Sequence, residues 1–354
     1  MSEPPAPVTG ERHRVAVLDD YQGVALGMAN WASLGEAVEV TAFRDHVDDP
    51  DELVSRLEPF DIIAAMRERT PFPRSLLERL PNLRLLVTSG PKNDAIDIDA
   101  ARDLGVVVSG TVGRNGIPGT VELTWALILA AARSLHREDA LVRAGGWQGG
   151  LGSVLHGKTL GIVGLGNIGP RMIPVAQAFG MNVTAWSRNL SQERAAEVGV
   201  KALSREEFFS TADVVTLHLK LSSRSVGYIG GEELRLMKPT AVLVNTSRGP
   251  LIDEAALIAA LSDGTIAAAG LDVYNIEPLP AGHPFRTLEN LVLSPHMGYV
   301  THETYADYFG GYLEDIEAFL QGNPIRVLTD GADLLGEVLK AVRPCLRARA
   351  SGSQ

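Results

Sequence analysis

The sequence contains almost no cysteine and no long apolar run, and each absence excludes a class of protein. Its only cysteine, Cys345, excludes a disulfide framework and a cysteine-based metal site, so we expect an incidental thiol and no bound metal. No apolar run reaches the roughly eighteen residues needed to cross a bilayer. The opening residues MSEPPAPVTGERHR lack the apolar segment of a signal peptide, so we expect a cytoplasmic protein with no membrane partner.

Positive charge is also scarce. The chain has 32 Lys and Arg residues against 43 Asp and Glu residues, which gives a formal net charge of −11. Because this charge repels a phosphate backbone, we expect no nucleic-acid partner. An anionic small molecule must instead be bound by cations that the fold gathers locally.

The sequence does contain enough apolar residues for two globular domains. It has 354 residues, of which 45% are hydrophobic, and this length exceeds the size at which one core keeps growing. Short apolar runs alternate with amphipathic segments, a pattern typical of parallel α/β sheets. We expect strands at 15–20, 38–43, 61–66, 83–89 and 105–110, and, after a Gly-rich turn, at 159–166, 182–186, 213–219, 241–247, 266–273 and 291–296.

Two segments have helical character. Residues 117–136 are apolar on nearly all sides, so we expect a helix there that is buried between domains or subunits. Residues 302–322 predict a helix that ends at Gly322 and packs against the first domain. Two α/β units of this kind predict a ligand-binding cleft at the carboxyl edges of their strands.

The segment GLGNIG at 164–169 matches the dinucleotide-binding pattern G-x-G-x-x-G. It follows an apolar run and precedes a segment of helical spacing, which is the context that this pattern requires. Its glycines permit a tight turn, close approach of a pyrophosphate and packing of the helix on the strand, and free N–H groups face the anion. The alternative is an ordinary glycine turn. The expected cofactor contacts are Gly164, Gly166, Asn167, Ile168 and Gly169.

The next expected strand ends in Ser187 and Arg188, where a fold that binds NAD usually carries Asp or Glu for the adenosine ribose. A carboxylate there repels the extra phosphate of NADP, whereas a hydroxyl beside a guanidinium binds it. These residues favour NADP as the cofactor, with NAD possible. The alternative is that Arg188 stacks on the adenine or points into water and that both cofactors bind.

Three further motifs follow expected strands of the second half: NTSRGPLID (245–253), LDVYNIEPLP (271–280) and SPHMGY (294–299). Together with GLGNIG, in this order, they closely resemble the D-isomer-specific 2-hydroxyacid dehydrogenase family, and the resemblance extends from about residue 14 to residue 330. It implies an enzyme that reduces a 2-keto acid reversibly to a D-2-hydroxy acid.

The resemblance also implies an architecture. It implies an α/β fold of two Rossmann-like domains with parallel sheets, in which a nucleotide-binding domain (111–302) is inserted into a flavodoxin-like substrate domain (13–110 and 303–335). Residues 1–12 and 336–354 are expected to be flexible tails. Members of the family form homodimers through the segment that corresponds to residues 117–150, and the apolar helix expected there agrees.

Individual roles follow from the same resemblance. Arg248 resembles the group that binds the carboxylate and the carbonyl oxygen of the substrate. Glu277 and His296 resemble a coupled catalytic pair, and Asp272 resembles the residue that contacts the nicotinamide carboxamide. The other cofactor contacts implied by the motifs are His218, Thr246 and Gly298.

The chemistry of these residue types agrees with the roles. Reduction of a 2-keto acid requires a hydride for the carbonyl carbon, a proton for its oxygen and a cation for the carboxylate. Histidine suits proton transfer because its unperturbed pKa lies near neutrality, and a hydrogen-bonded carboxylate favours the imidazolium. Arginine can bind a carboxylate with two hydrogen bonds. Taken alone, Arg248 can be a turn or ion-pair residue, His296 a structural histidine and Glu277 a surface residue.

The first domain departs from the family pattern. TSGPKN (88–93) resembles the loop whose backbone N–H groups bind the substrate carboxylate, but Pro91 removes a donor and Lys92 adds a cation. Cations there suit a second acidic group on the substrate. A solvated face is the alternative, because Glu68 separates two arginines and loop charges are usually exposed. The expected substrate contacts are Arg67, Ser89, Gly90, Lys92, Arg248 and Tyr299.

Two other functions stay open at this point. One is a nucleotide-sensing regulator on the same scaffold, like the transcriptional corepressors that resemble this family and keep the same catalytic residues. The other is an oxidase of phosphite or formate. Formate dehydrogenases of the superfamily resemble this chain but have glutamine at the position of Glu277, so the acid points to alcohol–ketone chemistry.

Overall fold

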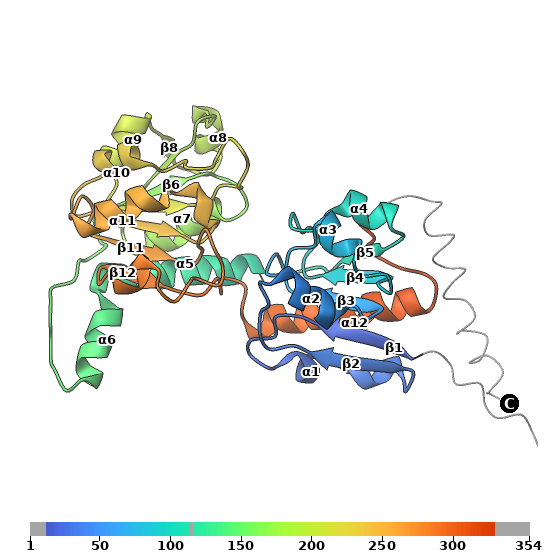
Figure 1. Ribbon diagram of the computed structural model, residues 1–354. Coiled ribbons are helices and arrows are strands. Elements are labelled where there is room, and N and C mark those ends of the chain that lie inside the picture. The colour runs from blue at the N-terminus through green and yellow to red at the C-terminus, as the bar shows by residue number, and fades with distance from the viewer. Residues whose placement is uncertain (1–11, 114–115, 330–354) are drawn as a thin grey trace, which may run out of the picture. The chain divides into compact units, whose positions relative to one another are not determined.

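The computed structural model describes residues 12–113 and 116–329, which fold into two compact units (Figure 1). Unit 1 contains residues 12–113 and 302–329, and unit 2 contains residues 116–301. Unit 2 is therefore inserted into the chain of unit 1. The predictions for residues 1–11 and 330–354, including Cys345, concern segments outside the described ranges.

The described part of unit 1 contains one parallel sheet with the strand order of flavodoxin-like folds. The order is β2-β1-β3-β4-β5, and Ala64 of β3 lies beside Val87 of β4. Strands β3, β4 and β5 are buried along their whole length, which explains their largely apolar sequences. The strands are β1 (His13–Val17), β2 (Val38–Ala42), β3 (Ile62–Ala65), β4 (Leu85–Thr88) and β5 (Val107–Gly110).

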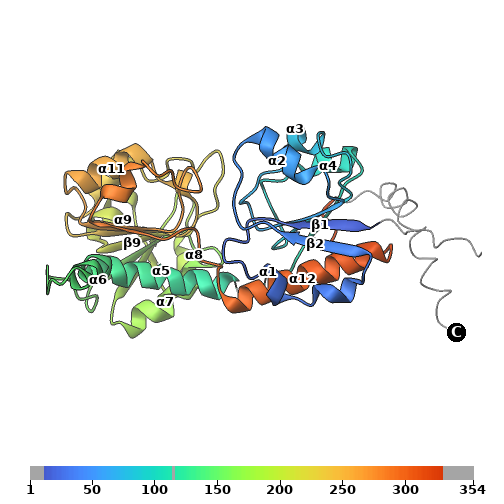
Figure 2. The same cartoon turned by 60° about the horizontal axis from the view of Figure 1, so that its bottom comes forward.

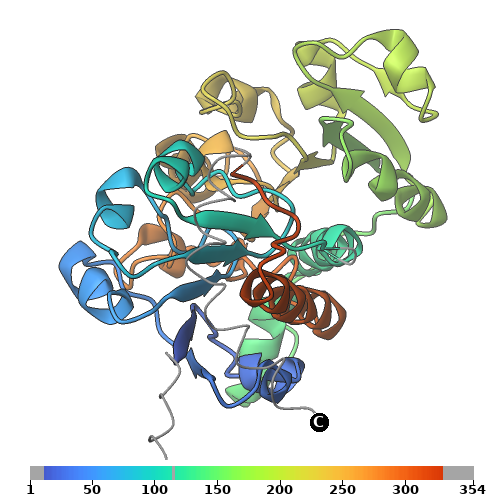
Figure 3. The same cartoon turned by 90° about the vertical axis from the view of Figure 1, so that its right-hand side faces the viewer.

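Helices cover both faces of this sheet (Figure 3). One core joins apolar side chains of the sheet to α2 (Pro50–Leu57), α3 (Arg74–Leu77) and α4 (Ile98–Asp103). On the other face lie α1 (Ala25–Met28) and α12 (His302–Leu320), which contact each other. The helix predicted over 302–322 is thus present, and it packs in unit 1 against β4. A short 3-10 helix spans Trp31–Leu34.

The described part of unit 2 contains a seven-stranded parallel sheet. Its order is β12-β11-β10-β9-β6-β7-β8, which includes the 3-2-1-4-5-6 order of dinucleotide-binding folds and adds one strand at an edge. The order reverses between β6 and β9, and such a switch point is where these folds bind ligands. The strands are β6 (Thr159–Val163), β7 (Asn182–Trp186), β8 (Lys201–Ala202), β9 (Val214–Leu217), β10 (Val242–Asn245), β11 (Ala268–Leu271) and β12 (Leu291–Leu293).

Two apolar cores hold this sheet between two layers of helices. One core includes α9 (Arg205–Thr211), α10 (Gly231–Leu236) and α11 (Glu254–Ser262). The other includes α5 (Gly116–Arg133), α7 (Gly169–Ala178) and α8 (Gln192–Ala196). Figure 2 shows α11 on one side of the strands and α5 with α7 on the other. Short 3-10 helices span Gly249–Leu251 and Pro284–Thr287. The predicted fold class, two parallel α/β units with one inserted into the other, is confirmed.

One local prediction was wrong, and one strand was missed. The helix predicted over 117–136 ends at Arg133, because Ser134 adopts a left-handed conformation (φ 49°) that an α-helix cannot continue through. A separate helix, α6 (Leu135–Arg143), follows and has no buried residue. The sequence pattern also missed β8, whose two residues are too few to show an alternation.

None of the described helices is long and apolar enough to span a membrane.

Candidate active site

The GLGNIG loop lies at the switch point of unit 2, between the end of β6 and the start of α7. Gly164 has φ +95°, and a Cβ there would lie 2.8 Å from the carbonyl oxygen of His218. At Gly169 a Cβ would overlap the carbonyl oxygen of Gly164. At Gly166, in contrast, the nearest atom to a Cβ would be 3.9 Å away. Two glycines therefore allow the backbone to fold tightly, and the third leaves an open surface that fits a pyrophosphate.

At the end of β7, the side chain of Arg188 is held by two neighbours. Its guanidinium donates to the carbonyl oxygen of Arg224 (3.0 Å) and lies 4.6 Å from the ring centre of Tyr228. Its backbone N–H donates to the Tyr228 hydroxyl (2.7 Å). Across the described residues, no carboxylate pairs with Arg188. The cation is thus oriented by a carbonyl group and an aromatic face, and its charge is not neutralised by an acid.

Two further expected cofactor contacts are buried polar residues that follow β9 and β10. Thr246 shares a hydrogen bond with Thr124 (Oγ1 to Oγ1, 2.8 Å). His218 contacts Thr216 through Nε2 (3.1 Å), and burial lowers the pKa of His218 to about 3. At neutral pH, His218 therefore carries no charge.

The three expected catalytic residues follow three neighbouring strands. Arg248 comes after β10, Glu277 after β11 and His296 after β12, and these strands lie side by side in the sheet. Because the strands are parallel, all three loops leave the same edge. The tertiary structure thus gathers residues that are separated by nearly fifty positions in the sequence.

His296 and Glu277 are in direct contact. Nδ1 of His296 lies 2.5 Å from Oε2 of Glu277, and both side chains are partly exposed. The other carboxylate oxygen, Oε1, accepts a hydrogen bond from the backbone N–H of Tyr274 (2.8 Å). His296 also has a left-handed backbone (φ 51°), which is uncommon for a residue other than glycine. Nε2 of His296 takes no part in this contact.

Asp272 holds the loop that carries His296. Its carboxylate accepts hydrogen bonds from the hydroxyl of Ser294 (2.6 Å) and from the backbone N–H groups of Met297 (2.8 Å) and Gly298 (2.9 Å). Asp272 is only 1% exposed, and burial raises its pKa. The contacts seen here are with the protein itself, so the predicted contact with a nicotinamide carboxamide stays a prediction.

Arg248 and Tyr299 lie close to these loops. The carbonyl oxygen of Arg248 accepts from the side chain of Asn245 (2.8 Å), and its guanidinium donates to the carbonyl oxygen of Ser247 (2.7 Å). Tyr299 is buried, and its ring packs edge-on against the ring of His296, with 5.8 Å between the ring centres. Tyr299 therefore supports the histidine whether or not it also contacts a substrate.

In unit 1, the carboxyl ends of β3 and β4 bring Arg67 and Ser89 together. The backbone N–H of Arg67 donates to the Ser89 hydroxyl (2.8 Å), and its guanidinium donates to the Ser89 carbonyl oxygen (3.2 Å). The guanidinium lies so close to Gly90 that a Cβ there would overlap it. It is also 3.3 Å from Glu68. Lys92, in contrast, is exposed.

Comparison with known proteins identifies the family. A model of the NAD-binding domain of D-isomer specific 2-hydroxyacid dehydrogenases matches residues 125–298. The chain is 42% identical over 256 residues to a glyoxylate reductase of Aeropyrum pernix, covering 70% of this chain and 76% of that protein. The chain belongs to the D-isomer specific 2-hydroxyacid dehydrogenase family.

Other members of the D-isomer specific 2-hydroxyacid dehydrogenase family agree with this assignment. A D-3-phosphoglycerate dehydrogenase of Archaeoglobus fulgidus is 35% identical over 278 residues, which cover 78% of this chain and 52% of that longer protein. A crystal structure of a phosphoglycerate oxidoreductase from Vibrio cholerae has a TM-score of 0.82 and 38% identity, and the match covers 87% of this chain and 99% of that one.

Membership of the 2-hydroxyacid dehydrogenase family makes this protein an oxidoreductase with a nicotinamide cofactor. It supports the reduction of 2-keto acids to 2-hydroxy acids as the class of reaction. Within residues 12–113 and 116–329, no cluster of three or more His, Cys, Asp or Glu side chains is arranged to hold a metal ion.

Sequence reasoning missed three residues that support the expected site residues: Asn93 in unit 1, and Tyr228 and Tyr274 in unit 2. The amide of Asn93 donates to the carbonyl oxygen of Arg67 (2.6 Å), Tyr228 supports Arg188, and Tyr274 bonds to Glu277. Asn93 lies in the TSGPKN segment and Tyr274 in the LDVYNIEPLP segment, so these motifs could have pointed to both residues. Tyr228 lies forty residues from Arg188 in the chain, and no local pattern points to it.

Proposed function

We propose that this protein reduces a 2-keto acid to the D-2-hydroxy acid, in a reversible reaction, with NADPH as the preferred cofactor. The observation that carries the proposal is the contact between Nδ1 of His296 and Glu277 (2.5 Å). A histidine whose inner nitrogen faces a carboxylate presents its other nitrogen to a substrate, in a form suited to exchanging a proton.

Unit 2 is the NAD(P)-binding domain in this proposal, and unit 1 is the substrate domain. The nicotinamide supplies the hydride for the carbonyl carbon of the substrate when it is bound. His296 donates the proton to the carbonyl oxygen, and Glu277 stabilises the imidazolium before the transfer. In the oxidative direction, neutral His296 removes the hydroxyl proton.

Arg248 binds the substrate carboxylate in this proposal. A guanidinium is permanently charged and can donate two parallel hydrogen bonds to a carboxylate. From unit 1 we propose Ser89, Gly90 and Arg67 as substrate contacts, because the structure brings these three together. Lys92 stays a candidate from the sequence, and its side chain is exposed.

NADP preference rests on Arg188 and Ser187. The ribose of NAD is usually recognised by an acid at the position of Ser187, and this chain has a hydroxyl there instead. The guanidinium of Arg188 has no carboxylate partner among the described residues and is held in place by Tyr228. An oriented cation of this kind suits the 2′-phosphate of NADP.

We also propose a homodimer formed through α6 and the segment after it. Helix α6 buries none of its residues in the single chain, and the following segment exposes large apolar side chains. Trp147 is 77% exposed and Leu151 is fully exposed. Apolar surface of this kind is typical of an interface between subunits.

The test is to follow the oxidation of NADPH and of NADH separately with a panel of 2-keto acids: glyoxylate, hydroxypyruvate, pyruvate, bulkier 2-keto acids and phosphonopyruvate. We expect at least one acid to be reduced, faster with NADPH, and the product to be the D isomer. Binding of NADPH without turnover of any acid would overturn the proposal in favour of a nucleotide sensor.

A further inference from the structure

We infer that Tyr274 is a positioning residue for proton transfer, because it bonds both to Glu277 and to the loop that carries His296. The inference rests on the proposed function of these two residues. It concerns what holds the pair in contact.

The first bond is to the acid. The backbone N–H of Tyr274 donates to Oε1 of Glu277 (2.8 Å), and the other oxygen of that carboxylate contacts His296. Tyr274 therefore determines how the carboxylate is turned toward the ring. A hydrogen bond to a charged acceptor is among the stronger ones in proteins.

The second bond is to the histidine loop. The hydroxyl of Tyr274 donates to the carbonyl oxygen of Ser294 (2.8 Å), two residues before His296, and also lies 3.3 Å from the carbonyl oxygen of Leu271. The rigid phenol ring thus spans the space between the loop of Glu277 and the loop of His296. Burial raises the pKa of Tyr274, so its hydroxyl stays protonated and remains a donor.

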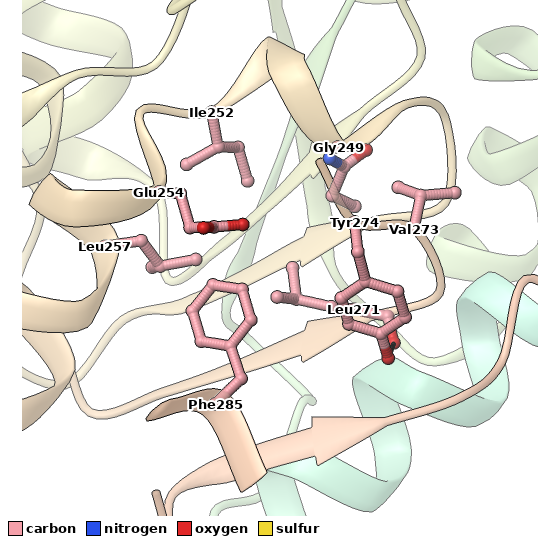
Figure 4. A pocket seen from close by; sticks show the side chains of 9 residues that line it. Gly249, Ile252, Glu254, Leu257, Leu271, Val273, Tyr274 and Phe285 are labelled. Carbon is pink, nitrogen blue, oxygen red and sulfur yellow. Dashed lines mark hydrogen bonds between the residues drawn. The ribbon is translucent and has the colours of Figure 1, made fainter. Parts of the chain in front are cut away.

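A third loop touches the same residue. Gly249 follows Arg248 directly, and a Cβ at Gly249 would overlap the backbone carbonyl group of Tyr274. Figure 4 shows Gly249 beside Tyr274, next to a small pocket that Leu271, Val273 and Phe285 also line. Tyr274 is therefore the point at which the loops of Arg248, Glu277 and His296 meet.

The packing around the ring fixes its position. Tyr274 is 8% exposed, and its ring centre lies 6.4 Å from that of Phe285. The pocket has a volume of about 10 Å³, at the lower limit for a single water, so the ring has little room to move. A phenylalanine would keep this packing and would lose only the hydroxyl, with its bonds to the carbonyl oxygens of Ser294 and Leu271.

The decisive variant is Tyr274→Phe, with Tyr312→Phe as the matched control. Tyr312 is also buried, and its hydroxyl also donates to a backbone carbonyl oxygen, that of Ala65 in unit 1 (2.8 Å). We expect Tyr274→Phe to lower kcat about tenfold, with the Kd of NADPH unchanged within about a factor of two, because a small displacement of catalytic groups is costly. Tyr312→Phe should leave kcat unchanged.

A second readout does not depend on turnover. The proton between His296 and Glu277 should give a proton NMR signal downfield of the amide region, which His296→Ala identifies by removing it. We expect the signal to move or broaden in Tyr274→Phe and to persist unchanged in Tyr312→Phe. Gly249→Ala, which pushes on the backbone of Tyr274, should reproduce the change.

The outcomes separate this inference from the proposed function. If Tyr274→Phe keeps both the NMR signal and the kcat of the wild type, the positioning role is excluded, even though His296→Ala is inactive. If His296→Ala retains turnover, the proposed function fails. The downfield NMR signal in Tyr274→Phe still decides whether Tyr274 holds His296 and Glu277 in contact.

Discussion

The guanidinium of Arg188 lies 4.6 Å from the ring centre of Tyr228, and the backbone N–H of Arg188 donates to the hydroxyl of the same tyrosine (2.7 Å). One aromatic residue thus holds both the main chain and the side chain of the arginine at the end of β7. This arrangement orients a cation without neutralising it.

We expect the double variant Ser187→Asp with Arg188→Ala to reverse the cofactor preference. Removal of the cation should weaken NADPH binding about tenfold to a hundredfold, because hydrogen bonds to charged groups are lost, and the new carboxylate should repel the 2′-phosphate. Titration of each cofactor by nucleotide fluorescence gives the two Kd values. Arg194→Ala is the control, since Arg194 is exposed and pairs with Glu197. An unchanged ratio of the two Kd values would refute the assignment of Arg188.

We expect His296→Ala to reduce kcat by about two to four orders of magnitude while the Kd of NADPH changes little, because general acid–base catalysis contributes on this scale. Steady-state kinetics and cofactor titration measure the two effects separately. His283→Ala is a matched control, because His283 also faces a carboxylate, that of Glu254 (3.1 Å). A loss of similar size in both variants would point to damaged folding instead of lost proton transfer.

Stability should depend on pH through Asp315. Burial raises the pKa of this carboxyl group to about 6, despite its hydrogen bond from Arg326 (2.9 Å). Because the folded pKa exceeds the unfolded value, the protonated group favours folding at low pH, and this contribution is lost as pH rises through about 6. The side chain at position 315 in the variant Asp315→Asn does not titrate. The free energy of unfolding of the variant should therefore rise relative to that of the wild type as the pH increases from about 4 to about 7.

Urea unfolding at several pH values measures that difference. Asp263→Asn, at an exposed position, is the comparison variant, because a hydrogen bond from Thr265 lowers the pKa of Asp263 and its pH dependence should have the opposite sign. A difference between Asp315→Asn and the wild type that is constant with pH would show that the carboxyl group ionises at its ordinary pKa.

The oligomeric state should depend on the segment after α6. Trp147→Ser combined with Leu151→Ser removes two exposed apolar side chains, so we expect a monomer where the wild type is a dimer. Light scattering after size-exclusion chromatography measures the mass. Leu26→Ser in unit 1 removes a similarly exposed side chain and should leave the dimer intact. A dimer that survives the double substitution would place the interface elsewhere.

Much of the fold could be predicted from the sequence, because buried parallel strands are encoded by short apolar runs that need no distant partner to be recognised. The runs that became β3, β4 and β10 are of this kind, and their strands are completely buried. The GLGNIG turn could also be predicted. Only glycine tolerates the backbone angle at position 164, and only glycine fits at position 169, where a Cβ would overlap the carbonyl oxygen of Gly164. The end of α5 could not be predicted, because apolar composition carries no information about the backbone angle at Ser134.

By itself, then, the sequence determined the two α/β units, the cofactor loop and the types of side chain that can take part in catalysis, because local patterns encode all three. Only the tertiary structure decided which side chains meet. His296 contacts Glu277, Asp272 accepts hydrogen bonds from the loop of His296, and Tyr274 contacts three loops. All of these contacts depend on the order β12-β11-β10 in the sheet. The physical reason is that contacts between loops of separate strands are set by strand pairing and packing, which act between residues far apart in the chain.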